Sequence, residues 1–263
     1  MDYRIILVCI INFIITLIGT LAYSVRIVGI RTGKIAISSA LFNAVSLFSR
    51  AAGVFQLPLL TKYVAEYKDK VNLVPVFYLL ILNVVISSII GALLLPTFQK
   101  IFTKGVETFS INKSVFRLML HSFSKSGVSY IKSSVSVPTK TNIKGVDFKK
   151  LPINLLIYNV LTVALLTAGI FSPVYASVLA PELDTTCMTL VSVLTGLASI
   201  LSALFVDPYL SVLTDEVIEG KYSTADYRGC VIGMVGTKII GSALTFVIFL
   251  PAAYLIVLIA NIL

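Results

Sequence analysis

The chain has 263 residues, of which 57% are hydrophobic and only 13% are charged, and its formal net charge is +9. Soluble globular domains carry about 25% charged residues, so this apolar excess is too large to bury inside one domain of such length. The composition therefore excludes a soluble protein and predicts an integral membrane protein. Basic loops beside anionic membrane lipids explain the positive charge, so we expect these lipids as partners and no nucleic acid.

Six apolar runs are long enough to cross a bilayer, whose core of ~30 Å needs ~20 apolar residues per helix. Strand-type alternation of apolar and polar residues is absent from these runs, so we predict an all-α membrane protein and not a barrel. The last run is long, and Pro251 offers a place for a kink in it. The runs span residues 5–26, 35–60, 74–98, 155–179, 188–206 and 231–263.

The distribution of basic residues predicts the orientation of the chain. Arg26, Arg31 and Lys34 follow the first apolar run, whereas a secretory signal carries its basic residues before that run, so we expect a true first helix. Fifteen Lys and Arg residues lie in the loops after the first, third and fifth runs, and four lie on the other side. Because cytoplasmic loops carry the excess, both termini are predicted outside.

The long third loop divides the chain into membrane helices 1–98, a basic cytoplasmic insert 99–150 and membrane helices 151–263. After Asn112, polar side chains recur every four residues opposite an apolar face, which predicts an amphipathic helix in the headgroup plane. This helix serves either as a topology anchor or as a collar for anionic headgroups. Residues 133–150 are expected to form a flexible linker. The polar face consists of Lys113, Arg117, His121 and Lys125.

Three helices on each side of the insert are consistent with a 3+3 pseudo-repeat of inverted topology, as in many transporters. A short sequence similarity supports this repeat, because IIGAL at residues 89–93 is similar to IIGSAL at residues 239–244.

Metal and disulfide chemistry are not expected. Cys9, Cys187 and Cys230 form no C-x-x-C pair and are odd in number, so we predict neither a disulfide framework nor a zinc site. His121 is the single histidine, which removes histidine-based metal clusters and most triads. We therefore expect no metal, no cofactor and no catalytic residue.

Two cations lie inside apolar runs. At ~1.5 Å per residue, Arg50 lies about 22 Å beyond Ile35, and Lys238 lies about 14 Å beyond Gly229. Charges at this depth are costly and must face protein or a hydrated cavity. One explanation is a buried ion pair with an acidic side chain that helix tilting brings close. The other is a cavity for an anion, because arginine suits phosphate through two parallel hydrogen bonds and lysine adds a point charge.

Four ordered segments resemble the bacterial Amj family of lipid II flippases, the alternates to MurJ, and together they represent nearly the whole chain. They read AYSVRIVGIRTGKIAISSALFNAVSLFSRAAGVFQLPLL, PVYASVLAPELDTT, FVDPYLSVLTDEVIEGKY and GTKIIGSALTFVIFLPAA. The resemblance implies a transporter in the bacterial cytoplasmic membrane. Its substrate would be lipid II, the undecaprenyl-pyrophosphate-linked disaccharide-pentapeptide, which moves from the inner to the outer leaflet for peptidoglycan synthesis.

Physical reasoning assigns roles to the basic residues for such a substrate. Arg26 and Arg31 are expected to capture it at the cytoplasmic side, and Arg50 and Lys238 to hold the diphosphate in transit. Acidic residues could gate by salt bridges or couple to protons, and the candidates are Asp207, Asp215, Glu216 and Glu182. Six helices enclose little space for so large a headgroup, and a homodimer would enlarge the cavity.

Three other functions stay open at this point. The chain could flip another polyprenyl phosphate, act as a membrane enzyme on a lipid diphosphate, or be a structural subunit in which Arg50 and Lys238 pair internally. A single histidine and the lack of a metal-ligand cluster leave the enzyme without a phospho-histidine or metal route.

Overall fold

The computed structural model describes residues 3–112, 133–136, 138–139 and 146–263, and its long elements are all helices. The amphipathic helix predicted at residues 113–125 lies outside the described residues. Two short 3₁₀ helices, η2 (Phe148–Lys150) and η3 (Pro181–Leu183), and a π-helix, η4 (Ser202–Val206), join the long elements. The long helices are α1 (Tyr3–Leu21), α2 (Tyr23–Thr32), α3 (Ile35–Tyr67), α4 (Val74–Asn112), α7 (Ile153–Leu179), α8 (Asp184–Leu201), α9 (Asp207–Ile218) and α10 (Thr224–Ile262).

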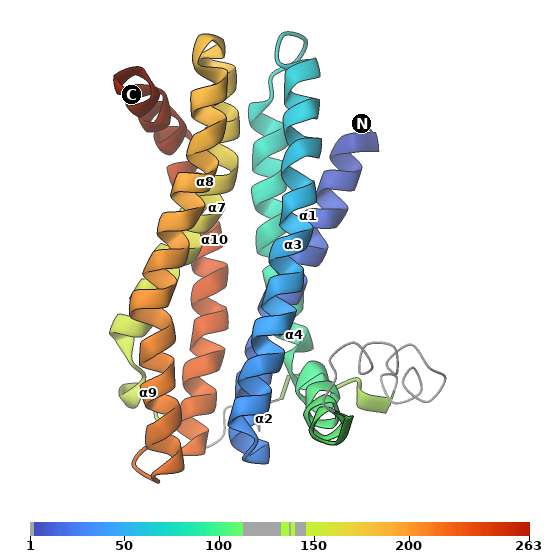
Figure 1. Ribbon diagram of the computed structural model, residues 1–263, viewed down its shortest axis with the longest axis vertical. Helices are drawn as coiled ribbons and strands as arrows, with labels where there is room; N and C mark the ends of the chain where they lie inside the picture. Colours follow the sequence, from blue (N-terminus) through green and yellow to red (C-terminus); the bar gives the residue numbers. More distant parts are fainter. Residues whose placement is uncertain (1–2, 113–132, 137, 140–145) are drawn as a thin grey trace.

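Within the described ranges, six spans are long and apolar enough to cross a membrane, which confirms the predicted number. Helices α1 and α2 together form the first span, and η3, α8, η4 and α9 together form the fifth. Both chain termini lie at one end of the bundle, here called the terminal end (Figure 1). The opposite end, where α2 ends and α10 begins, is here called the basic end.

The helices form two groups that stand side by side, α1–α4 and α7–α10 (Figure 1). In the first half, α1 packs against both α3 and α4, and in the second half α7 packs against both α8 and α10. The halves meet mainly where α10 contacts α4 and α2. Each half is therefore a three-helix unit built around its first helix.

One buried asparagine in each half ties the first helix to the last in the same way. Its amide nitrogen donates to a backbone carbonyl and to the side-chain oxygen three residues later. These contacts are Asn12 to Leu80 (3.1 Å) and Asn83 (3.4 Å), and Asn159 to Met234 (2.9 Å) and Thr237 (2.8 Å).

The next contact along each helix pair keeps the same register. Ser87, seven residues after Leu80, donates to the Phe13 carbonyl at 2.7 Å. Gly241, seven residues after Met234, approaches the Val160 carbonyl so closely that a Cβ there would lie 2.7 Å from its oxygen. Because α1 starts at the terminal end and α7 at the basic end (Figure 1), the halves run in opposite directions. This shared plan supports a 3+3 repeat of inverted topology.

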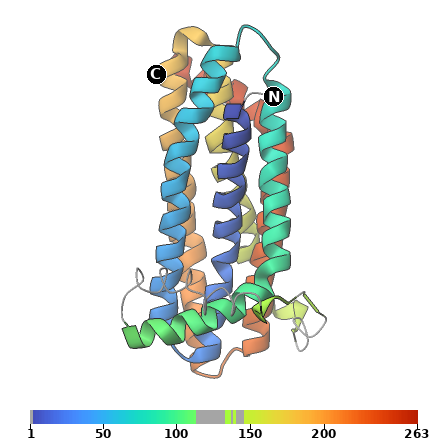
Figure 2. The ribbon, with the colours of Figure 1, turned by 90° about the vertical axis from the view of Figure 1, so that its right-hand side faces the viewer.

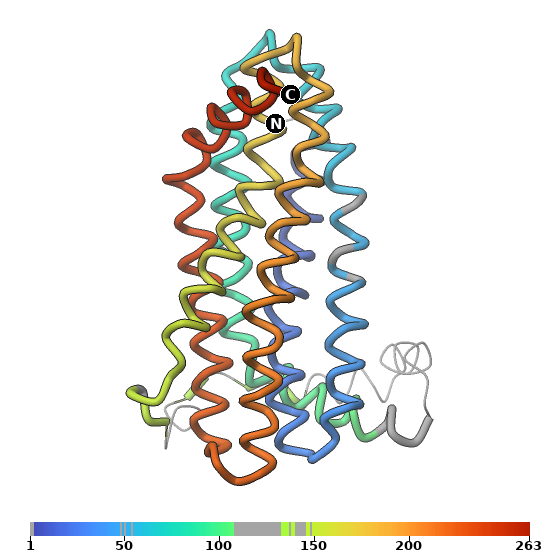
Figure 3. Tube along the Cα trace, turned by 60° about the vertical axis from the view of Figure 1, so that its left-hand side comes forward, coloured from blue at the N-terminus to red at the C-terminus, as the bar shows by residue number. Residues whose placement is uncertain are grey.

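Two prolines bend long helices without ending them. Pro96 lies inside α4, and the part of α4 beyond it turns across the basic end of the bundle (Figure 2). Pro251 lies inside α10, whose last turns also change direction (Figure 3). Proline removes one helical hydrogen bond and clashes with the carbonyl four residues earlier, which accounts for both bends. Helix α4 therefore continues to Asn112, whereas the sequence predicted that this third apolar run ends at residue 98.

The described parts of the segment predicted to be a flexible linker are anchored. The Thr97 hydroxyl donates to the Ser136 carbonyl at 2.9 Å and accepts from the Ser136 N–H at 3.0 Å. The Asp147 N–H donates to the Asp226 carboxylate at 2.8 Å. The linker prediction is wrong at these points because side chains of α4 and α10 bind its backbone.

Aromatic rings close the interface between the halves toward the terminal end. Phe77 of α4 is fully buried and stacks on Phe249 of α10, with their ring centroids 5.4 Å apart. Phe171 of α7 meets Phe77 edge to face at 6.5 Å. This apolar cluster contrasts with the interface nearer the basic end, which contains polar and charged side chains.

Candidate functional site

Lys238 lies between the two halves, within the membrane-spanning part of α10. It is fourteen residues from the start of α10 at Thr224, or about 21 Å along the helix. Its ammonium group donates to the Thr16 carbonyl of α1 at 3.4 Å. A Cβ added to Gly19 would lie 3.3 Å from the same nitrogen, so the absence of a side chain there makes room for the lysine.

The partner of Lys238 is a carbonyl oxygen and not an acid. In the part of the chain that the structure describes, the ion pairs join other residues, and none brings a carboxylate to Lys238. A lysine ammonium has three donors, of which this carbonyl uses one. The ammonium form of this lysine thus has donors left for an anion.

Arg50 belongs to the stretch of α3 that borders Lys238. The preceding residue, Ser49, donates from its hydroxyl to the Ile15 carbonyl at 2.8 Å. A Cβ added to Gly19 would lie within 3.5 Å of this hydroxyl as well as 3.3 Å from the Lys238 nitrogen. The side chain of Arg50 lies outside the described structure, so its part in the site stays a prediction.

Arg26 of α2 and Asp207 of α9 form an ion pair across the two halves. Nη2 of Arg26 donates to Oδ1 of Asp207 at 2.9 Å. The guanidinium carbon lies 4.2 Å from the centroid of the Phe42 ring, a cation–π contact with one face of the group. Nε of Arg26 is buried and has no hydrogen-bond partner. A residue expected to capture substrate and one expected to gate are therefore in direct contact.

Hydrogen bonds join three neutral polar side chains that are close in sequence to Arg26 at one end and to Lys238 at the other. Tyr23, one helical turn before Arg26, donates from its hydroxyl to the Asn159 side-chain oxygen at 3.4 Å. The Asn159 amide donates to the hydroxyl of Thr237, the residue before Lys238, at 2.8 Å. The part of the interface between Arg26 and Lys238 therefore contains hydrogen-bonded polar side chains from both halves.

The sequence reasoning did not find Tyr23, Asn159 and Thr237, because it followed charge. The available signal was the position of Asn159, a strong hydrogen-bonding group within the apolar run LLIYNVLTV. A buried amide in a membrane helix needs a partner, and here the partners lie on α10.

The other predicted residues lie away from these polar side chains. Arg31 is exposed near the end of α2, and Asp215 and Glu216 lie in the last turn of α9 at the basic end. The backbone carbonyls of Asp215 and Glu216 accept hydrogen bonds from the turn that follows α9. Glu182 is exposed in η3 near the terminal end, so the structure separates it from the other acidic candidates.

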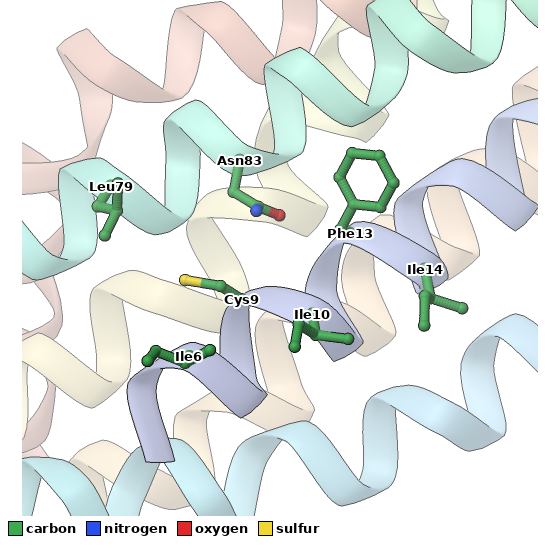
Figure 4. A pocket seen from close by; sticks show the side chains of 7 residues that line it. All are labelled: Ile6, Cys9, Ile10, Phe13, Ile14, Leu79 and Asn83. Carbon is green, nitrogen blue, oxygen red and sulfur yellow. The ribbon is translucent and has the colours of Figure 1, made fainter. Parts of the chain in front are cut away.

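A shallow groove of about 400 Å³ opens between α1 and α4 (Figure 4). Its lining contains no charged side chain and one amide, Asn83, the partner of Asn12. An uncharged groove suits a hydrocarbon chain and offers nothing to a diphosphate, so the polar interface remains the candidate site. The groove is lined by Ile6, Cys9, Ile10, Phe13, Ile14, Leu79 and Asn83.

Comparison with known proteins places this arrangement in a family. The chain is 34% identical over 243 residues to the Bacillus subtilis (strain 168) protein named Lipid II flippase Amj, and the match covers 91% of this chain and 90% of the relative. No solved structure matches the chain. The family model Amj, described as Alternate to MurJ, matches residues 11–260. The chain therefore belongs to the Amj family.

Proposed function

We propose that this protein is a lipid II flippase of the bacterial cytoplasmic membrane. It moves the undecaprenyl-pyrophosphate-linked disaccharide-pentapeptide from the inner to the outer leaflet, so it is a transporter and not an enzyme. The name of the Bacillus subtilis relative and the family match support this function. The six membrane-spanning helices supply the required multi-pass architecture.

The observation that carries the proposal is Lys238. Its ammonium group lies between the halves within a membrane span, next to the Thr16 carbonyl. Charged groups at this depth are rare and usually mark the path of an ion or a substrate. A lipid that carries a diphosphate through the bilayer supplies the anion that this cation lacks.

The remaining cations extend this path toward the basic end. Arg31 is exposed at that end and captures the headgroup, and Arg26 receives it next. Arg50 then acts with Lys238 in transit. The basic end accordingly faces the cytoplasm and both termini lie outside, as the excess of Lys and Arg in its loops favours.

Two further partners belong to the proposal. Anionic lipids of the inner leaflet bind the basic loops through electrostatic attraction. A homodimer with its axis along the membrane normal would enlarge the passage for a disaccharide-pentapeptide headgroup.

Vesicles that contain the purified protein as the only candidate transporter test the function. Lipid II is placed in the inner leaflet, and its appearance in the outer leaflet is followed with an impermeant reagent for the headgroup. The expected result is faster exposure than in protein-free vesicles. Unchanged exposure would overturn the flippase, undecaprenyl phosphate moving in place of lipid II would indicate the alternative substrate, and release of inorganic phosphate would indicate an enzyme.

A further inference from the structure

The ion pair between Arg26 and Asp207 has two ends with different surroundings. The Arg26 side chain is 18% exposed, whereas the Asp207 side chain is 51% exposed. A half-exposed carboxylate is readily hydrated, so losing its partner costs it little. A mostly buried guanidinium needs an anion beside it far more.

The hydrogen bonds of Arg26 leave one donor of its guanidinium without an acceptor. Nη2 and Nε form one edge of the guanidinium, the edge that can hold a phosphate through two parallel bonds. Asp207 binds only Nη2, at 2.9 Å, and Nε is buried without a partner. Phe42 holds the guanidinium from its face, independently of the carboxylate.

The position of Asp207 in its helix permits movement. Asp207 is the first residue of α9, directly after the π-helix Ser202–Val206 and before Pro208. Proline lacks an N–H, so the helical hydrogen bonds are weakened at this junction, and π segments often occur at functional sites. The other Asp207 oxygen has one weak contact, from the Ser202 hydroxyl at 3.5 Å.

We propose that Asp207 occupies the phosphate-binding edge of Arg26 in the empty transporter and that the diphosphate of the substrate displaces it. The exchange removes the ion pair between α9 and α2 and leaves the diphosphate near the Tyr23–Asn159–Thr237 hydrogen bonds. Asp207 is thus an internal competitor for the substrate anion. The identity of the ligand rests on the proposed function, whereas the competition itself rests on the geometry of Arg26.

The competition is measured with inorganic pyrophosphate as the probe, titrated by calorimetry into the purified full-length protein in detergent. Asp207→Asn removes the competing charge and keeps the size of the side chain, so pyrophosphate is expected to bind roughly three- to fivefold more tightly, the scale of a half-exposed ion pair. Arg26→Gln is expected to abolish this gain when combined with Asp207→Asn.

Glu219→Gln is the matched control, because it also removes one acidic charge near the basic end, from a surface pair with Lys221. An equal gain in Glu219→Gln and Asp207→Asn would reduce the effect to net charge and overturn the proposal. Unchanged or weaker binding in Asp207→Asn, or no binding of pyrophosphate to either this variant or the wild type, would also overturn it.

A charge exchange, Arg26→Asp with Asp207→Arg, separates competition from simple cross-linking. A pair that only joins the helices predicts wild-type lipid II exposure in this double variant, which would overturn the proposal. Competition predicts a loss, because the arginine then extends from the exposed side of α9. If the Asp207→Asn gain is present while the wild type moves no lipid II, the exchange stands and the proposed substrate fails.

Discussion

Replacing Lys238 by methionine removes the cation from the centre of the site and keeps an unbranched side chain. The bundle is expected to tolerate this change. In the described structure, no carboxylate pairs with the lysine, and its carbonyl partner at Thr16 also accepts the Thr20 hydroxyl at 2.7 Å. The substitution therefore leaves neither a buried charge nor an unsatisfied oxygen.

The effect on transport should be large. A hydrogen bond to a charged group contributes about 1.5–3 kcal/mol, and each 1.4 kcal/mol is about tenfold. Lys238→Met is thus expected to slow lipid II exposure in vesicles by roughly 10- to 100-fold, with an unchanged melting temperature in detergent. Lys221→Met, the same change at an exposed pair with Glu219, should keep the wild-type rate. Full-rate transport by a correctly inserted Lys238→Met protein would refute the assignment of the diphosphate to this lysine.

Three further predictions concern packing and capping. Gly241→Ala places a methyl group 2.7 Å from a backbone oxygen of α7, so it should destabilise the protein by about 1–3 kcal/mol in thermal unfolding. Gly236→Ala, on the same helix with open space around it, should not; equal melting temperatures would contradict the close α7–α10 contact. Gly19→Ala brings a methyl group 3.3 Å from the Lys238 ammonium, so lipid II exposure is expected to be a few-fold slower. The control Gly196→Ala, whose methyl group meets nothing within 4 Å, should match the wild type. The same rate in both variants would remove Gly19 from the site. Ser223→Ala removes the side chain that accepts the N–H three residues later at the start of α10, and hydrogen exchange should show about 1 kcal/mol less protection in the first turn.

The substrate path was predicted from charged residues alone. The structure adds neutral polar residues to it. Charge identified Lys238 as a cation inside an apolar run and Arg26 as a basic residue directly after one. Tyr23 and Asn159 are neutral and became visible only through their hydrogen bond between helices. The path therefore combines a few predicted cations with uncharged side chains that tertiary packing aligns.

The short sequence similarity between the two halves aligns them in a different register from the contacts between their helices. The similarity of residues 89–93 and 239–244 pairs Gly91 with Gly241. The contacts pair Ser87 with Gly241, because each lies seven residues after the carbonyl that an asparagine binds. Apolar helices share many short patterns by chance, whereas a hydrogen bond between two helices selects one alignment.

The sequence by itself determined the class of the protein, the six spans and the asymmetry of the basic loops. These properties follow from local composition. Each membrane helix must form its own backbone hydrogen bonds and must contain enough apolar residues to cross the bilayer. The tertiary structure decided which charges meet: it joined Arg26 to Asp207, residues separated by 181 positions, and placed Lys238 against a carbonyl of α1. Such contacts depend on how helices from the two halves pack, and no pattern within a single helix encodes that arrangement.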